Sequence, residues 1–270
     1  MGKPLALKHL LPFFVAVLSL GPIFGQQIVM SAVDYPPYTF PGNAGSSAIG
    51  LASEIATEAG KASGIDVRIE IVPMARAGWY IGARKHQALL GLADWVAGEN
   101  FEPEVIDILN LGFIFYYKRS QFPAGLTFSS LEELRPYRIG NIRGSSTLGI
   151  LEGAGITPHL FTDLFQAFRN LDAGRIDAVV GGDLSGQLIV QSLFPEKAAE
   201  FASTKGTFYT RKVSIVLRKE DSGLVRKFRE GLATIYADGT YLRVVGRYCP
   251  PETPMEDLIP ENIRNYGKRD

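Results

Sequence analysis

The stretch Tyr137-Arg138-Ile139-Gly140-Asn141-Ile142-Arg143-Gly144-Ser145-Ser146-Thr147 joins a short apolar strand to a glycine and three hydroxyl residues. A helix-like segment from Thr147 to Gly153 follows. Where a strand enters a helix through such a turn, the first backbone N–H groups of the helix lack partners and point to where an anion can bind. Serine and threonine are also common N-caps. The stretch therefore fits either half of a ligand site or an ordinary helix start.

The N-terminus has the pattern of a secretory signal. Lys3 and Lys8 precede an apolar run from Leu10 to Phe24, and Gly25 follows. The run is shorter than the roughly 20 residues that span a bilayer comfortably, and it has the three-part layout of a cleavable signal peptide. We therefore expect residues 1–25 to be removed and the mature chain to be a free periplasmic protein.

Composition limits what the remaining chain can be. The 270 residues are 46% hydrophobic and 21% charged, which fits a soluble protein of two domains. The 28 basic residues balance 28 acidic residues, so the sequence indicates no basic surface for nucleic acid. Cys249 is the single cysteine, so no internal disulfide can form and stability must come from the core.

The pattern along the chain favours an α/β fold. A strand at Ile28 to Val33 is followed by a helix at Ser46 to Ser63, a strand at Val67 to Val72 and a short helix that carries Arg76 and Trp79. Strands that alternate with helices predict a parallel sheet with crossovers.

A sequence echo indicates two similarly built lobes. Ala83 to Gly91 and Ala173 to Gly181 each contain a polar helix end, a basic turn and an Ala-apolar-apolar-Gly strand. Between and after them, Ile108 to Tyr117 and Lys212 to Arg218 read as strands that cross from one lobe to the other.

The two crossings predict a hinge and a set of lobe boundaries. Lobe 1 would comprise residues 26–118 and 213–270, and lobe 2 residues 119–212. Two lobes on a hinge leave a cleft lined by the carboxyl ends of parallel strands, which is where α/β sheets place their ligands.

An aromatic loop follows the first strand of the mature chain. Asp34 to Phe40 contains two adjacent prolines and the aromatic residues Tyr35 and Tyr38, so it is a loop at the carboxyl end of a strand. Tyr35 and Tyr38 are candidates to stack on a ligand. The alternative is that they cover the edge of the sheet.

Motifs in a fixed order cover almost all of the mature chain. They are Asp34-Tyr35-Pro36-Pro37-Tyr38, Val72-Pro73-Met74-Ala75-Arg76-Ala77, Arg143-Gly144-Ser145-Ser146-Thr147, Ala173-Gly174-Arg175-Ile176-Asp177-Ala178-Val179-Val180 and Ala237-Asp238-Gly239-Thr240-Tyr241. In this order they resemble the family 3 periplasmic solute-binding proteins of ABC importers, whose typical ligands are polar amino acids. The resemblance implies a two-lobed periplasmic-binding-protein fold of type II, with two β crossovers that form the hinge.

The resemblance also implies roles for individual residues. Tyr35 would stack on the ligand, and Met74 would lie on the cleft wall. Ser145, Ser146 and Thr147 would hold a carboxylate through hydroxyl and backbone N–H groups.

Two departures from the family pattern concern the ligand clamp. Amino-acid binders of the family carry an arginine after the first lobe's repeat, whereas the corresponding segment here, Ala93 to Glu104, contains none. The aspartate that binds the ligand amino group is expected directly after the Ala-Val-Val-Gly strand, where this chain has Gly182, with Asp183 one residue later. A shift of one residue at a helix start turns the side chain by roughly 100 degrees, so the direction of Asp183 stays open.

Other residues are placed by sequence to replace the missing clamp. Arg76 and Arg143 can each bind a carboxylate through a planar, bidentate guanidinium, or can be solvated surface residues. Asp94 and Trp95 follow a strand end, where they can meet a ligand amine and form an aromatic wall, or can cap a turn and fill the core.

Enzyme motifs are missing from the sequence. It has no nucleophile elbow, P-loop, zinc-protease motif or cysteine pair, and His86 and His159 are separated on expected surface turns. The prediction is a monomeric exported binding protein without cofactor or metal, which takes a small polar solute to the permease of an ABC importer. The alternatives are an enzyme resembling periplasmic cyclohexadienyl dehydratases, with Asp94, Glu99 or Asp183 as acid, and an accessory protein for a membrane sensor.

Overall fold

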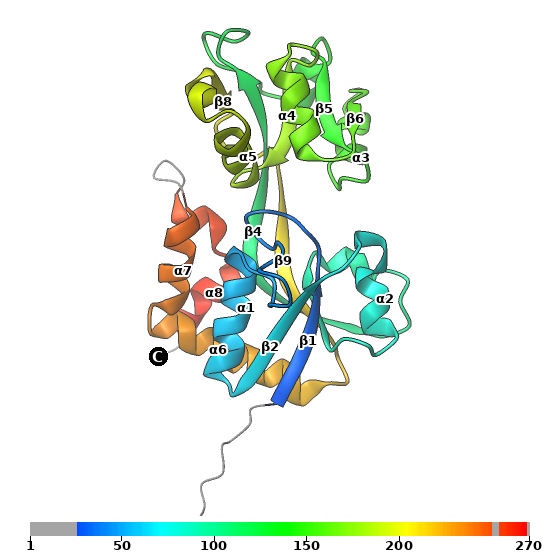
Figure 1. Ribbon diagram of the computed structural model, residues 1–270, viewed down its shortest axis with the longest axis vertical. Coiled ribbons are helices and arrows are strands. Elements are labelled where there is room, and N and C mark those ends of the chain that lie inside the picture. The colour runs from blue at the N-terminus through cyan, green and yellow to red at the C-terminus, as the bar shows by residue number, and fades with distance from the viewer. Residues whose placement is uncertain (1–25, 250–253, 269–270) are drawn as a thin grey trace, which may run out of the picture.

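The computed structural model describes residues 26–249 and 254–268, so the expected signal peptide lies outside the described residues. Two lobes are joined by two long strands, β4 (Pro103–Lys118) and β9 (Tyr209–Arg218), which pair antiparallel (Figure 1). The two crossings predicted from the sequence are therefore present. No helix within the described ranges is long and apolar enough to cross a membrane.

One sheet runs through both lobes, with strand order β2-β1-β3-β9-β4-β7-β5-β6 and with β8 paired to β4. Strand β1 pairs in parallel with β2 and β3 in lobe 1, and β5 pairs in parallel with β6 and β7 in lobe 2, as the alternation of strands and helices predicted. The order puts β7 directly beside β4, whereas β5 and β6 lie further from the hinge. The end of β7 is consequently held at the junction of the lobes.

Lobe 1 packs its helices around the strands β1, β2 and β3. Leu51, Ile55 and Ala59 recur on one face of α1 and are fully buried. Gly231 lets α6 approach α1 closely, because a Cβ added there would lie 2.0 Å from the Ala59 carbonyl oxygen. The elements are β1 (Gln26–Ala32), α1 (Leu51–Ala62), β2 (Ile65–Ile71), α2 (Ala77–Gly82), β3 (Ala88–Gly91), α6 (Ser222–Ala237), α7 (Thr240–Tyr248) and α8 (Glu261–Arg264).

Lobe 2 is the smaller α/β unit. Asp163 caps its helix α4 by accepting a hydrogen bond from the Gln166 N–H at 2.7 Å, and Phe168 and Leu171 of that helix are fully buried. The elements are β5 (Ile139–Ile142), α3 (Leu148–Gly153), β6 (His159–Phe161), α4 (Leu164–Asp172), β7 (Ala178–Gly182), α5 (Ser185–Leu193) and β8 (Phe201–Ser203). Because both hinge strands continue through the junction, the boundaries at 118/119 and 212/213 remain a prediction.

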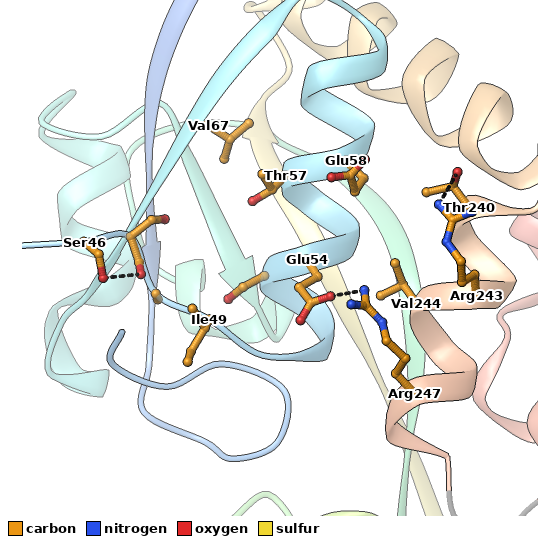
Figure 2. Close-up of a pocket in the computed structure, with 13 residues that line it drawn as sticks. Ser46, Ile49, Glu54, Thr57, Glu58, Val67, Thr240, Arg243, Val244 and Arg247 are labelled. Atoms are coloured by element: carbon orange, nitrogen blue, oxygen red, sulfur yellow. Dashed lines mark hydrogen bonds and ion pairs between the residues drawn. The ribbon is translucent and has the colours of Figure 1, made fainter. Parts of the chain in front are cut away.

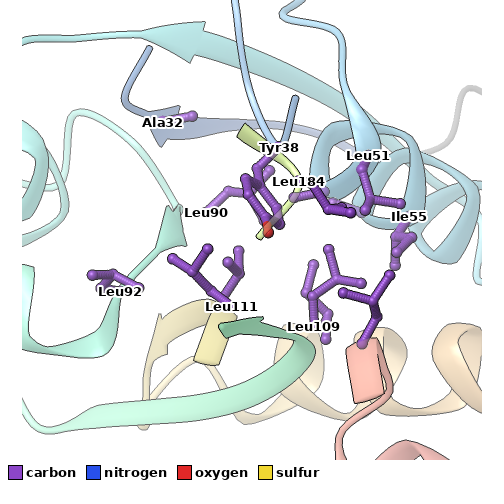
Figure 3. Close-up of a cluster of buried hydrophobic side chains, with 14 of the residues drawn as sticks. Ala32, Tyr38, Leu51, Ile55, Leu90, Leu92, Leu109, Leu111 and Leu184 are labelled. Carbon is purple, nitrogen blue, oxygen red and sulfur yellow. The ribbon is translucent and has the colours of Figure 1, made fainter. Parts of the chain in front are cut away.

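One cluster of buried apolar side chains extends from lobe 1 across the hinge into lobe 2. Figure 3 shows its central part, where Leu184 of lobe 2 lies with Tyr38 and Leu111. Leu184 is 3% exposed and Tyr38 is 2% exposed. The lobes thus share part of their core at the end of β7.

Helix α1 begins later than expected. The sequence predicted a start at Ser46, but Ile49 pairs with Phe40 in an isolated β-bridge and Ala48 donates to the Ile69 carbonyl at 2.9 Å. Gly50, with a φ of 119°, then turns the chain into the helix. The predicted helix ran through a segment whose backbone is held by the neighbouring sheet.

His86 was expected on a surface turn and is instead buried, with 5% exposure. Its Nδ1 lies 2.7 Å from the Ser31 hydroxyl, its Nε2 lies 3.3 Å from a Glu70 carboxylate oxygen, and its ring stacks on Tyr80. Burial lowers the pKa of His86, with Glu70 opposing. The expectation was wrong because a polar sequence context does not reveal cross-strand partners.

Candidate ligand site

The carboxyl ends of the parallel strands of both lobes point toward the junction between the lobes (Figure 1). We call the residues at these ends, with those of β4 and β9 beside them, the interlobe face. The sequence-predicted site residues fall on this face or next to it. Their side chains differ in what they contact.

The two tyrosines of the aromatic loop stack on each other, with ring centroids 5.7 Å apart. Tyr35 is half-buried, and its hydroxyl abuts Gly182 of lobe 2. Burial raises the pKa of Tyr35 to about 12. Tyr38 lies in the core, where it fits the sheet-covering alternative better than stacking on a ligand (Figure 3).

Asp183 faces the hinge. Its carboxylate accepts hydrogen bonds from the Tyr38 hydroxyl at 2.8 Å, from the Leu184 N–H at 2.9 Å and from the Gly112 N–H at 3.2 Å. Burial raises the pKa of Asp183, and these hydrogen bonds oppose the rise. The side chain whose direction the sequence left open is therefore engaged by groups from lobe 1 and from β4.

Gly112 is a residue that sequence reasoning missed. A Cβ added to it would lie 2.6 Å from an Asp183 carboxylate oxygen and 2.2 Å from the Thr207 methyl group. Only glycine leaves room for this approach. The signal was a glycine inside the apolar run Ile108 to Tyr117, because a glycine within a strand often marks close approach of another group.

Asp94 pairs with an arginine that the sequence did not single out. Arg211 Nη2 lies 2.7 Å from Asp94 Oδ1, and its Nη1 donates to the Tyr209 hydroxyl at 3.3 Å. The Arg211 side chain is 21% exposed and that of Asp94 is 51% exposed. Arg211 follows Asp94 by more than a hundred residues, so only the pairing of β9 in the sheet brings it to the first lobe's strand ends.

Trp95 lies in the short 3-10 helix Ala93–Val96 and is half-buried against the core. A Cβ added to Gly91 would lie 2.3 Å from the indole ring. Gly91 therefore makes the space in which the ring lies. This placement fits a largely structural role for a side chain that stays partly exposed.

Met74 and Arg76 lie at the surface of lobe 1, in the 3-10 helix Met74–Arg76. Met74 is 49% exposed, and Arg76 is exposed. On lobe 2, Arg143 is also exposed. Within the described parts of the chain, no hydrogen bond or ion pair holds the guanidinium of Arg76 or of Arg143. Each is therefore available to an anion.

The turn after β5 has an internal hydrogen-bond network. Asn141 Nδ2 donates to the Thr147 hydroxyl at 3.0 Å, and the Ser145 and Thr147 hydroxyls lie 2.8 Å apart. Thr147 is fully buried, whereas Ser145 and Ser146 are half-buried. The Ser146 hydroxyl makes no hydrogen bond within the described structure. Asn141, which orders the turn, was missed, and a polar residue inside the short strand was its signal.

A pocket of about 670 Å³ lies away from the interlobe face, between α1 and α7 of lobe 1 (Figure 2). Both of its guanidinium groups are already engaged, since Arg247 pairs with Glu54, and Arg243 donates to the Thr240 hydroxyl at 3.0 Å. No group of metal-ligating side chains is present in residues 26–249 and 254–268. The unpaired guanidinium groups at the interlobe face are better placed for an anionic ligand.

No protein-family model matches the sequence, and no curated protein matches it. Solved structures do match. The sensor domain of a histidine kinase with similarity to periplasmic binding proteins is 20% identical with a TM-score of 0.66, over 83% of this chain and 96% of that chain. An ancestral arginine-binding protein bound to arginine is 20% identical with a TM-score of 0.65, over 84% and 100%.

A substrate-binding protein of an ABC uptake transporter from Streptococcus pneumoniae, with bound histidine, is 16% identical with a TM-score of 0.64, over 82% of this chain and 92% of that chain. At such identities the likeness shows the fold. The chain has the two-lobed, type II periplasmic-binding-protein fold, and the fold predicted from the sequence is confirmed.

Proposed function

We propose that this protein is an exported solute-binding protein that captures a small polar ligand, amino-acid-like or bearing a carboxylate, between its two lobes. The observation that carries the proposal is the fold, in which two lobes meet at a pair of hinge strands. Solved proteins with this fold hold arginine or histidine. Closure of the lobes would bury the ligand and make the closed form depend on occupancy.

Two unpaired guanidinium groups support an anionic group on the ligand. Arg76 lies on lobe 1 and Arg143 on lobe 2, so closure would bring positive charge to the ligand from both sides. Ser146 and the backbone of its turn would hold the carboxylate on the lobe 2 side, with Ser145 beside it.

Lobe 1 and the hinge would supply the remaining contacts. Tyr35 and the exposed Met74 would form the wall on the lobe 1 side, and Trp95 would offer a ring edge. The Asp94 and Arg211 pair would line the base beside the hinge strands. These roles need no cofactor and no metal.

The proposed partner is the permease of an ABC importer in the inner membrane, which the closed monomer would meet in the periplasm. Substrate-binding proteins of ABC uptake transporters share the fold. The signal-like N-terminus supports export.

Calorimetry on protein that has been stripped of ligand by unfolding and refolding tests the proposal. A panel of amino acids, organic acids and polyamines should contain a carboxylate-bearing compound that binds. The double variant Ser145→Ala, Ser146→Ala should weaken its binding by about 1 to 3 kcal/mol through lost hydrogen bonds to a charged group. The matched control, Ser129→Ala with Ser130→Ala, changes two adjacent exposed serines elsewhere in lobe 2. Binding of neutral sugars alone would contradict the proposal.

A second candidate is a role as a ligand-presenting protein for a membrane sensor. The likeness to a histidine kinase sensor domain favours it, because the same fold is used there for sensing. Pull-down from membranes with closed, liganded protein distinguishes the two: capture of a permease favours import, and capture of a sensor favours signalling.

A further inference from the structure

The turn after β7 forms a dense junction between the lobes. We call Tyr38, Gly112, Tyr116, Asp183 and Leu184 the hinge cluster. Tyr38 comes from lobe 1, Gly112 and Tyr116 from the hinge strand β4, and Asp183 and Leu184 from the β7–α5 turn of lobe 2. Three parts of the chain that move relative to one another in a hinged protein therefore meet here.

The Asp183 carboxylate is held from all three of these parts. Oδ1 accepts from the Tyr38 hydroxyl and from the Leu184 N–H, and Oδ2 accepts from the Gly112 N–H. The backbone of the same turn is held as well, because the Tyr116 hydroxyl donates to the Asp183 carbonyl at 2.7 Å. These three bonds occupy most of the roughly four acceptor sites of a carboxylate, which leaves little capacity for a ligand ammonium.

Apolar contacts hold the same turn. Leu184 is 3% exposed and lies in the cluster that contains Tyr38 and Leu111 (Figure 3). Pulling the turn away from lobe 1 would expose this apolar side chain to water, which is unfavourable. The turn is therefore fastened to lobe 1 both by hydrogen bonds and by burial.

We propose that Asp183 is a pivot that ties lobe 2 to lobe 1 beside the hinge strands, and that it takes no part in binding a ligand ammonium. The tie is close to the hinge, so the lobes can rotate about it while it stays intact. The statement about the ligand ammonium rests on the proposed solute-binding function. It follows that an α-amino group on the ligand adds no affinity through Asp183.

The pivot is tested without ligand, by Förster transfer between fluorophores at Lys61→Cys on lobe 1 and Arg175→Cys on lobe 2, in a Cys249→Ser background. Both labelled positions are exposed. Tyr38→Phe and Asp183→Asn should each shift or broaden the distribution of interlobe distances. Both changes keep the size of the side chain, and circular dichroism checks that the variants are folded.

The matched control is Tyr248→Phe. Its hydroxyl also donates to a carboxylate, that of Glu54, but both residues belong to lobe 1. The control should leave the distance distribution as in the wild type. Distributions for Tyr38→Phe and Asp183→Asn that coincide with the wild type would overturn the pivot.

The ligand half is tested by calorimetry with matched pairs of probes, L-glutamate with glutarate and L-phenylalanine with 3-phenylpropionate. Asp183→Asn should change the affinity for both members of a binding pair by the same factor, to within about threefold. A loss at least tenfold larger for the amino member would overturn this half, while the proposed function would stand. Failure of every probe to bind the wild type counts against the proposed carboxylate ligand, and the fluorescence result then decides the pivot.

Discussion

Two turns of lobe 2 follow parallel strands and point toward the same junction, yet they differ in what their polar groups do. The turn after β5 leaves Arg143 exposed and Ser146 half-buried, open to a ligand. In the turn after β7, the Asp183 carboxylate already accepts hydrogen bonds from Tyr38 and Gly112. The difference follows from strand order, because β7 is hydrogen-bonded to the hinge strand β4 and β5 is one strand further out. A polar side chain at a strand end is therefore available to a ligand only where groups at the hinge do not already bind it.

The largest effect expected from this comparison is on stability, at the apolar residue that ends each turn. Leu184→Ala should lower the free energy of unfolding by about 2 to 5 kcal/mol, because it leaves a cavity in a shared core. Leu148→Ala, at the corresponding place after the β5 turn, should cost much less because Leu148 is half-exposed. Urea denaturation measures both, and equal losses would mean that the β7 turn is no better fastened than the other.

A smaller loss of folding stability is expected when a methyl group is added at Gly112, beside Asp183. Gly112→Ala places a Cβ within 2.6 Å of an Asp183 carboxylate oxygen, so it should destabilise by about 1 to 3 kcal/mol. Gly149→Ala on α3 is the control, since an added Cβ there meets nothing within 4 Å. Thermal and urea unfolding compare the two. A neutral Gly112→Ala variant would show that the turn can move away from β4 at little cost.

The smallest expected effect is a difference in pH dependence between the two ends of β7. Burial raises the pKa of Asp183 in the folded protein, so its protonation adds stability as pH falls, and this contribution is lost as pH rises through the folded pKa. The hydrogen bond from Arg138 lowers the pKa of Asp177, so its contribution is present above the unfolded pKa of roughly 4 and is lost as pH falls through the folded pKa.

Unfolding free energies measured from pH 7 down to about pH 2 separate these cases, because the Asp183 contribution changes above the unfolded pKa of roughly 4 and the Asp177 contribution changes below it. Relative to Asp183→Asn, the wild type should gain stability toward acid, and relative to Asp177→Asn it should lose stability toward acid. The two difference curves therefore have opposite slopes. Parallel curves would show that the carboxylates lie in similar environments.

Much of the fold could be predicted because it depends on local patterns. Alternating strands and helices, the echo at Ala83 and Ala173, and the two apolar crossings require only the spacing of side chains along the chain. The start of α1 was predicted too early because Ala48 is held by a strand distant in sequence. The burial of His86 was missed for the same reason, since its partner Ser31 lies on another strand.

The sequence by itself determined the α/β class, the two lobes, the hinge and the positions at which polar groups follow strand ends, because each of these depends on periodicity and on residues close in the chain. The tertiary structure alone decided which of those groups remain open. Asp94 received Arg211 as a partner through the pairing of β9, and Asp183 received Tyr38 and Gly112 through the position of β7 beside the hinge. Hydrogen bonds form between groups that are close in space, and a single chain read in order does not contain those distances.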